Sequence, residues 1–374
     1  MMKKPYLHDI IKEQLLKRIE EGTYPSDAPF PGTKALAREF STSSVTIDKA
    51  LSSLVDMGYI SRKARKGSVV NPSEYWKVDS TSRKNAPVLY SLIMRDSPSP
   101  YFWKNTIRGI YDMVHIHDAE ILSCYIDEDF EAAWSSVRGL KRKGVKGVIY
   151  APVSMPTEEE YYGYNKKMLE VLRELKLPFI LIDRYLKNEK ANYVISKDYE
   201  AAVKIMEHLF AVGVRKPICL THLFNTAFED RVNGFVDTLR AHGFSQEESE
   251  ERVIDIAPGT ILLDANDTAG VSAVLNQAPP FDGVLSVNAV NLYALINTLH
   301  RKKHIPSTIE SVHRLKFANF DDIGLLHIRG LAVSAVQQSH RIGELAAHIL
   351  LELLPKWPDA EFHVAKDYGF KKYL

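Results

Sequence analysis

The sequence predicts an α/β protein with two parts, a small helical domain that ends in a β-hairpin and a larger two-lobed unit built on parallel sheets. Within residues 7–70, three helical stripes precede a short alternating hairpin, whereas from residue 87 strand-like runs and helical stripes alternate. Repeated βα units of this size indicate parallel sheets with right-handed crossovers. The stretch 87–374 is too long for one core of this type, so two lobes are expected.

The predicted boundaries divide the chain into residues 1–70, 71–86 and 87–374. The middle segment is rich in Ser, Thr, Asn, Lys and Pro and has no apolar periodicity, as expected of a linker.

Composition is that of an ordinary soluble globular protein, with 374 residues, 45% hydrophobic residues, 25% charged residues and a net charge of +1. The charge is unevenly placed, because residues 1–70 hold 12 Lys and Arg against 8 Asp and Glu. Cys124 and Cys219 each lie in an apolar run, which favours reduced, buried thiols. No signal-peptide-like stretch or membrane-length apolar window occurs, so we expect a cytoplasmic protein that does not enter a membrane.

The first domain has the element order of a winged helix-turn-helix. Its predicted elements are helices at 6–22, 33–40 and 43–58 and strands at 59–62 and 68–70. Ser43 can cap the third helix, and the hairpin tip at 63–67 is basic. In this motif the third helix enters the major groove and the wing contacts the DNA backbone.

Two segments carry a resemblance to the N-terminal domain of the GntR family of transcription regulators. Phe30 to Ala37 is similar to the family's Leu-Pro-Ser-x-x-x-Leu-Ala motif, and Ser43 to Leu51 to its Ser-Arg-x-Thr-Val-Arg-x-Ala-Leu motif. Ser44 and Asp48 stand where that family usually has arginines that contact DNA. Neither side chain can make the bidentate contact of arginine to guanine, so we expect an altered operator sequence. The DNA-contacting residues that the resemblance and the basic tip imply are Lys34, Arg38, Ser43, Ser44, Thr46, Lys49, Arg65, Lys66 and Gly67.

The second part alternates strands and helices throughout. Strands are predicted near 87–94, 119–126, 145–151, 178–182, 193–196, 216–221, 252–256, 282–287, 315–320, 331–336 and 362–365. Helices are predicted near 102–117, 130–143, 157–175, 198–212, 227–242, 267–276, 289–302 and 338–354. The run at 178–182 is apolar throughout, as in a strand buried on both faces, and Asp183 and Arg184 follow it directly.

Polar and aromatic side chains collect where the predicted strands end. They are Tyr101, Phe102, Asp183, Arg184, Arg231, Asn288, Asp321 and Gln337. Open α/β sheets bind ligands at the carboxyl ends of their strands. Two carboxylates, two guanidinium groups, two amides and two rings suit a neutral polyhydroxylated ligand, because the polar groups bond its hydroxyls and the rings cover its C–H faces.

These positions also carry a resemblance, over residues 87–366, to the effector domain of the LacI family and to periplasmic sugar-binding proteins. The segments that match include Asp183-Arg184, Arg231 to Phe235 and Phe320 to Asp322, whereas Lys197-Asp198-Tyr199 replaces a usual Asp-Asn pair. The resemblance implies that the eight residues line a monosaccharide pocket between two lobes. A GntR domain joined to a LacI-type domain resembles the arabinose-regulator subfamily. It implies a homodimeric, sugar-responsive repressor that binds a pseudo-palindromic operator.

Other functions were weighed against this one. Asp183 and Asp321 have the residue types of a glycosidase pair, but no activated nucleophile, phosphate-binding glycine loop or metal-ligand spacing accompanies them. His115 and His117 point apart on a helix at this spacing. We therefore expect no enzyme activity, no catalytic residue, no metal and no cofactor. A stand-alone sugar-binding protein without DNA regulation is the alternative function.

Overall fold

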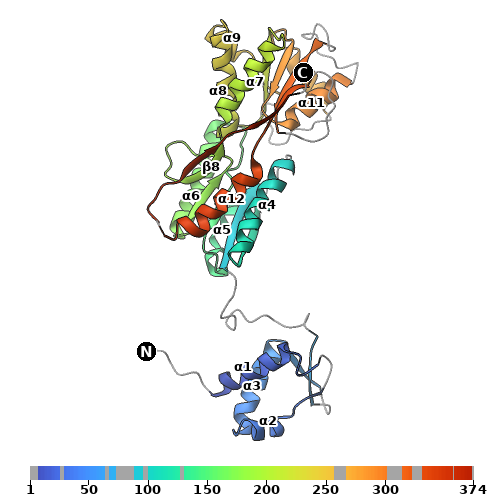
Figure 1. The fold of residues 1–374 in the computed structure, drawn as a ribbon, viewed down its shortest axis with the longest axis vertical. Coiled ribbons are helices and arrows are strands. Elements are labelled where there is room, and N and C mark those ends of the chain that lie inside the picture. The colour runs from blue at the N-terminus through green and yellow to red at the C-terminus, as the bar shows by residue number, and fades with distance from the viewer. Residues whose placement is uncertain are drawn as a thin grey trace. The chain divides into compact units, whose positions relative to one another are not determined.

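In a computed structural model of the chain, two compact units form, Met1–Ala86 and Pro87–Leu374. The structure describes residues 7–25, 29–63, 67–72, 88–95, 100–126, 130–256, 267–300, 314–321, 331–356 and 358–372. The expected linker lies outside these ranges except for residues 71 and 72. None of the helices in the described ranges has the length and apolar character needed to cross a membrane. Figure 1 shows the elements of both units.

The first unit contains the expected winged helix-turn-helix, called the head below (residues 7–70). Its helices are α1 (Leu7–Glu20), α2 (Thr33–Glu39) and α3 (Ser44–Asp56), and its strands are β1 (Pro29–Phe30), β2 (Ile60–Lys63) and β3 (Gly67–Val70). The strands form an antiparallel sheet in the order β1-β3-β2. Leu15, Leu36, Ile47 and Leu54 are fully buried between the helices. Strand β1 was not predicted, because two residues cannot display an alternating pattern.

The second unit holds two sheets, as the alternating pattern predicts, and each has six strands in the described part of the chain. The first lobe is built on the order β14-β8-β7-β6-β4-β5, with all its strands parallel. These strands are β4 (Val88–Arg95), β5 (Ala119–Ile126), β6 (Val148–Tyr150), β7 (Phe179–Ile182), β8 (Asn192–Ser196) and β14 (His363–Lys366). The run that the sequence marks as buried on both faces is therefore a central strand, β7.

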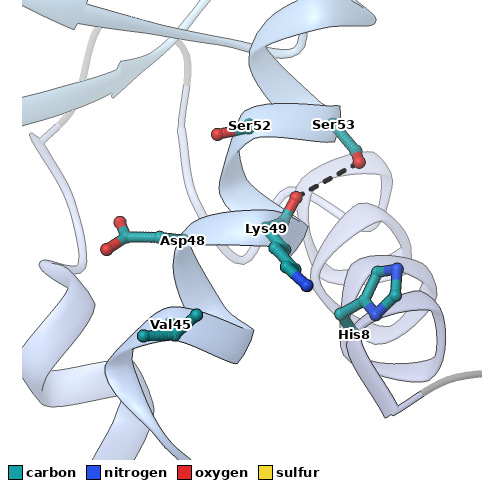
Figure 2. A pocket seen from close by; sticks show the side chains of 6 residues that line it. All are labelled: His8, Val45, Asp48, Lys49, Ser52 and Ser53. Atoms are coloured by element: carbon teal, nitrogen blue, oxygen red, sulfur yellow. Dashed lines mark hydrogen bonds between the residues drawn. The ribbon is translucent and has the colours of Figure 1, made fainter.

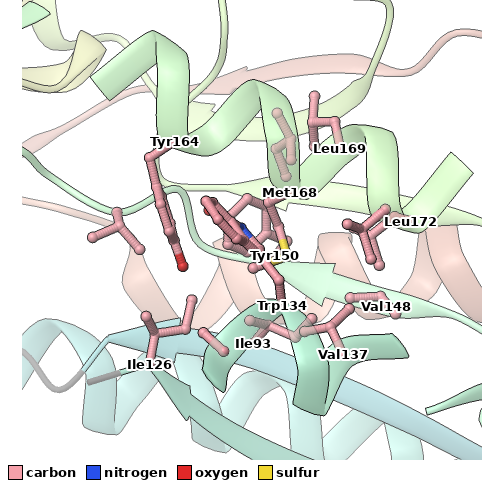
Figure 3. Close-up of a cluster of buried hydrophobic side chains, with 14 of the residues drawn as sticks. Ile93, Ile126, Trp134, Val137, Val148, Tyr150, Tyr164, Met168, Leu169 and Leu172 are labelled. Carbon is pink, nitrogen blue, oxygen red and sulfur yellow. The ribbon is translucent and has the colours of Figure 1, made fainter. Parts of the chain in front are cut away.

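Helices cover both faces of the first sheet. They are α4 (Pro100–Ile116) and α12 (Ser339–His348) on one face, and α5 (Phe130–Arg138) and α6 (Glu158–Glu174) on the other. Figure 3 shows the core under α5 and α6, where Trp134 stacks on Tyr164 with ring centroids 5.3 Å apart. Helix α6 begins with a capping box from Thr157 to Glu160.

The second lobe is built on the order β10-β9-β11-β12-β13-β15. Its strands are β9 (Pro217–Thr221), β10 (Val253–Asp255), β11 (Gly283–Ser286), β12 (Lys316–Phe320), β13 (Leu331–Val336) and β15 (Gly369–Lys372), and β15 alone of these runs antiparallel to its neighbour. Helices α7 (Asp198–Ala211) and α8 (Thr226–Ala241) pack in one core cluster, and α10 (Thr268–Leu275) and α11 (Ala289–His300) pack in another. The short helix α9 (Gln246–Glu250) and β15 were not predicted.

In the part of the second unit that the structure describes, the chain passes between the two lobes three times. The crossovers run from β8 to α7, from β13 to α12, and from β14 to β15. The Lys197 amide of the first donates to the Lys366 carbonyl at 2.9 Å, and the Lys197 ammonium lies 3.1 Å from the Asp367 carboxylate of the third. Gln338 Nε2 of the second donates to the Asp367 carbonyl at 2.9 Å. The ends of β8 and β13 therefore lie at the boundary of the lobes, and β7 pairs with β8 beside it.

Candidate functional site

Two aspartates occupy equivalent positions in the two lobes. Asp183 follows β7 with φ 72°, and Asp321 follows β12 with φ 73°. Each backbone amide donates to the neighbouring strand, Asp183 to the Val194 carbonyl at 3.0 Å and Asp321 to the Ala335 carbonyl at 2.9 Å. Asp tolerates the left-handed conformation better than most residues. The same turn therefore presents a carboxylate at one strand end in each lobe.

Gln337 connects this region across the lobes. It lies on the crossover after β13, and its Nε2 is 3.3 Å from Asp183 Oδ1 and 3.1 Å from Ser196 Oγ. All three side chains are buried. The structure thus brings together Asp183 and Gln337, which lie 154 residues apart in the sequence.

Arg184 is held inside the first lobe. Its Nη1 donates to the Pro152 carbonyl at 2.7 Å, and its Nε lies 3.2 Å from Asp183 Oδ2. The guanidinium therefore neutralises the Asp183 carboxylate beside it.

Arg231 lies in a buried network of the second lobe. Its Nε is 2.6 Å from Asp198 Oδ1, its Nη1 donates to the Val287 carbonyl at 2.5 Å, and its Nη2 to Tyr368 Oη at 2.8 Å. The Tyr368 hydroxyl donates to the same Asp198 oxygen at 2.6 Å. This arrangement satisfies a buried charge with a partner of opposite sign and with hydrogen bonds.

Asp198 and Tyr368 were not among the predicted site residues. Asp198 begins α7 directly after the first crossover, and Tyr368 lies on the third. Burial raises the pKa of Asp198 to about 7 against the attraction of the Arg231 guanidinium. The signal in the sequence was the unusual segment 197–199, but its link to Tyr368, 170 residues away, exists only in the fold.

Three further residues were predicted to bind the ligand, namely Asn288, Phe102 and Tyr101. Asn288 Oδ1 accepts from the Asn291 amide at 2.8 Å and so caps the start of α11. Phe102 is buried in the core of the first lobe and meets Trp103 edge to face with centroids 5.0 Å apart. Tyr101 belongs to α4, and its side chain is outside the described part of the chain. Ligand contact by any of the eight residues remains a prediction.

The predicted DNA-contacting residues lie on α2, α3 and the wing of the head. Ser43 is the N-cap of α3, as expected, and its Oγ accepts from the Thr46 amide at 3.2 Å. Four other predicted residues are exposed, namely Lys34, Arg38, Ser44 and Lys49. Gly67 begins β3 with φ 80°, a conformation that favours glycine. The other two, Arg65 and Lys66, are outside the described residues.

A shallow hollow of about 460 Å³ lies between α1 and α3 of the head. Figure 2 shows the side chains that line it, His8, Val45, Asp48, Lys49, Ser52 and Ser53. The Ser53 hydroxyl donates to the Lys49 carbonyl at 3.2 Å. Most of the hollow's residues thus come from the helix that this motif places in the major groove.

Comparison with known families matches both units. Residues 89–361 match the profile described as periplasmic binding proteins and sugar binding domain of LacI family, and residues 7–70 match bacterial regulatory proteins, gntR family. The HTH-type transcriptional regulator RegA of Clostridium saccharobutylicum is 24% identical over 86% of this chain and 92% of its own length. The arabinose metabolism transcriptional repressor of Halalkalibacterium halodurans is 20% identical over 64% of this chain and 62% of its own length.

Solved structures share the fold. A LacI family transcriptional regulator from Enterococcus faecium with bound ribose superposes with a TM-score of 0.59 at 17% identity, over 76% of this chain and 97% of its own. The complex of the transcriptional regulator CelR with cellobiose also gives a TM-score of 0.59, at 13% identity, over 91% of this chain and 98% of its own.

Proposed function

We propose a repressor mechanism for this chain, which belongs to the family of periplasmic binding proteins and LacI-type sugar binding domains. With its gntR-family head, it is a sugar-responsive, DNA-binding transcription regulator. In the proposed mechanism, a neutral monosaccharide bound between the two lobes changes the affinity of the head for operator DNA. The coupling passes through a change in the arrangement of the lobes, which alters the placement of the two heads of a dimer.

The observation that carries the proposal is the pair of left-handed aspartates at equivalent strand ends, with Gln337 bonded to one of them from a crossover. Carboxylates at these positions accept from sugar hydroxyls, and an amide both donates and accepts. Since the crossovers join the lobes, a ligand held there makes contacts that depend on the lobe arrangement. Among similar proteins, one is a repressor of arabinose metabolism and two structures hold ribose or cellobiose, which supports a sugar as the ligand here.

The proposal includes further properties of the protein. The protein acts in the cytoplasm as a homodimer. Its operator is pseudo-palindromic, because two symmetric heads require two half-sites on one face of the duplex. The protein is a regulator and not an enzyme. The names of two similar proteins support this, because one is called a transcriptional regulator and the other a transcriptional repressor. No cofactor takes part.

Calorimetry with a panel of neutral monosaccharides, followed by a mobility shift with and without the sugar that binds, tests the mechanism. The expected result is micromolar binding of one sugar and a change in operator affinity when that sugar is added. If no sugar binds, or if a bound sugar leaves operator affinity unchanged, the proposed mechanism is wrong.

The variant Asp321→Ala tests the site itself. The substitution removes an acceptor for ligand hydroxyls and should weaken the sugar by roughly 2–4 kcal/mol, or about thirtyfold to thousandfold. Operator binding without sugar should stay at the wild-type level, because Asp321 lies in the second unit and the head is a separate unit. Wild-type sugar affinity in the variant would exclude Asp321 from the site.

A truncated chain that lacks residues 1–72 separates this function from the alternative, a stand-alone sugar-binding protein. The truncated chain should bind the sugar and lose the operator, since the predicted DNA contacts all lie in the head. Operator binding by the truncated chain would show that the DNA-binding site does not lie in the head.

A further inference from the structure

Val45 is an exposed apolar side chain at the start of the DNA-recognition helix. It is the second residue of α3, and 66% of its surface is accessible to solvent. Scattered exposed apolar residues are common on protein surfaces and need no function by themselves. The position of this one, in the first turn of the helix that enters the major groove in this motif, makes it different.

The exposed face of α3 has helical periodicity. Val45, Asp48, Lys49 and Ser52 follow the spacing i, i+3, i+4, i+7 and line the same hollow (Figure 2). The opposite face consists of Ile47, Ala50, Leu51 and Leu54, which are all buried in the core of the head. The exposed face of α3 is the one available to a binding partner, and its first side chain is the isopropyl group of Val45.

Several polar side chains around Val45 are already paired within the head. Ser43 Oγ accepts from the Thr46 amide and lies 2.9 Å from Thr46 Oγ1. The Asp48 carboxylate accepts from the Thr33 hydroxyl and pairs with Arg62. These contacts occupy part of the hydrogen-bonding capacity of Ser43, Thr46 and Asp48, whereas an apolar contact by Val45 requires no exchange of hydrogen-bond partners.

We propose that Val45 recognises the C5-methyl group of a thymine in the major groove of each operator half-site. The methyl is the one apolar group that a base pair presents there, and contact with an aliphatic side chain distinguishes thymine from the other bases. The inference rests on the proposed function, since it takes α3 as the recognition helix. It assigns sequence recognition to a residue that neither family motif specifies.

Uracil substitution tests the methyl contact directly, because uracil differs from thymine only in lacking this group. Duplexes are first selected from a random pool with the full-length wild-type protein. Each thymine of the selected operator is then replaced by uracil, and the dissociation constant is measured. One thymine in each half-site should respond, with a loss of about fourfold per half-site, as expected for one buried methyl.

The variant Val45→Ala should bind the thymine operator more weakly by a similar factor and should no longer distinguish uracil from thymine at that position. Because Val45 is exposed, the variant should fold, which the thermal unfolding midpoint verifies. Leu7→Ala is the matched control, since Leu7 is an exposed apolar residue of α1 that is 53% accessible. This control should keep the wild-type dependence on the methyl group.

The outcomes separate the two proposals. If the wild type binds a specific duplex and no thymine responds to uracil, or if Val45→Ala still loses affinity on the uracil operator, the methyl contact is wrong and the regulator function stands. If the wild type selects no duplex at all, both proposals fail.

Discussion

The Asp48 carboxylate lies on the exposed face of α3, between groups from two other elements of the head. It accepts from Thr33 Oγ1 of α2 at 3.1 Å and lies 3.3 Å from Arg62 Nη2 of β2. Half of each charged side chain is exposed, so the ion pair contributes only about 0–1 kcal/mol to stability. We expect a larger effect on DNA binding, because the Asp48 carboxylate would repel phosphates and holds a guanidinium that would otherwise attract them.

Replacing Asp48 by Ala should therefore strengthen DNA binding without selecting a sequence. Release of Arg62 adds one cation to the DNA-facing surface. The slope of log affinity against log salt concentration should therefore become steeper by about 0.9, the value for one phosphate contact. The free energy of unfolding should change by less than about 1 kcal/mol. Titrations of random and selected duplexes at several salt concentrations measure both effects.

Glu39→Ala is the control, because it makes the same charge change and breaks the Arg18–Glu39 pair elsewhere in the head. Equal gains in the two variants would mean that net charge alone is responsible and that the Asp48–Arg62 pair has no special role.

At this scale the sequence predicts positions better than contacts. Asp183, Asp321 and Gln337 could be predicted because each follows a recognisable strand, and the structure does bring Gln337 to Asp183. The three bonds from the Arg231 side chain to Asp198, Val287 and Tyr368 could not be predicted, because they join residues from three separate segments. The exposure of Val45 follows from the periodicity of α3, but its significance depends on the pairing of its neighbours.

Helices α4 and α12 pack through reciprocal glycines at the point where they meet. A Cβ atom added at Gly343 would lie 2.0 Å from the Thr106 carbonyl oxygen, and one added at Gly109 would lie 2.0 Å from the His340 carbonyl oxygen. Both obstacles are backbone atoms, which cannot rotate away. The two helices can approach this closely only because neither glycine has a side chain.

Gly343→Ala should therefore destabilise the second unit by roughly 1–3 kcal/mol, because the helices must separate. Gly163→Ala is a matched control, since Gly163 lies in α6 and an added Cβ would meet no atom within 4 Å. The control should stabilise the unit by about 0.5–1 kcal/mol through the better helix propensity of alanine. Denaturant unfolding of the two variants measures the difference, and equal effects would contradict the proposed close packing.

Most elements could be predicted because their apolar residues repeat with the period of a strand or a helix. Where this signal is short or weak, the prediction fails. The two-residue strand β1 is too short for any pattern, α9 has the sequence Gln-Glu-Glu-Ser-Glu without an apolar stripe, and β15 is largely exposed. The sequence also predicts one helix over 130–143, but α5 ends at Arg138, just before Gly139, and a short 3₁₀ turn follows.

Among the described residues, the two lobes of the second unit are connected in two regions. One consists of the three crossovers, and the other is a set of direct contacts between loops of the two lobes. In the second region Met155 and Phe224 form an antiparallel bridge, and Asn225 Nδ2 donates to Ser154 Oγ at 3.0 Å. Thr226 Oγ1 accepts from the Tyr185 amide and donates to the Tyr185 carbonyl, both at 3.0 Å. These contacts can open while the chain connections stay intact, so they contribute to the free-energy difference between lobe arrangements.

Thr226→Val should weaken effector binding without touching the effector. Valine has the shape of threonine but removes both hydrogen bonds to Tyr185, which should disfavour this lobe arrangement by about 1–3 kcal/mol. If the effector binds this arrangement, its affinity should fall about fivefold to 150-fold in calorimetry, while operator affinity without effector changes little. Thr238→Val is the control, because Thr238 is a buried residue of the same helix whose hydroxyl donates to the Gly234 carbonyl within α8. A similar loss of effector affinity in both variants would show that the effect comes from damage to α8, and the loop contacts would then have no part in effector binding.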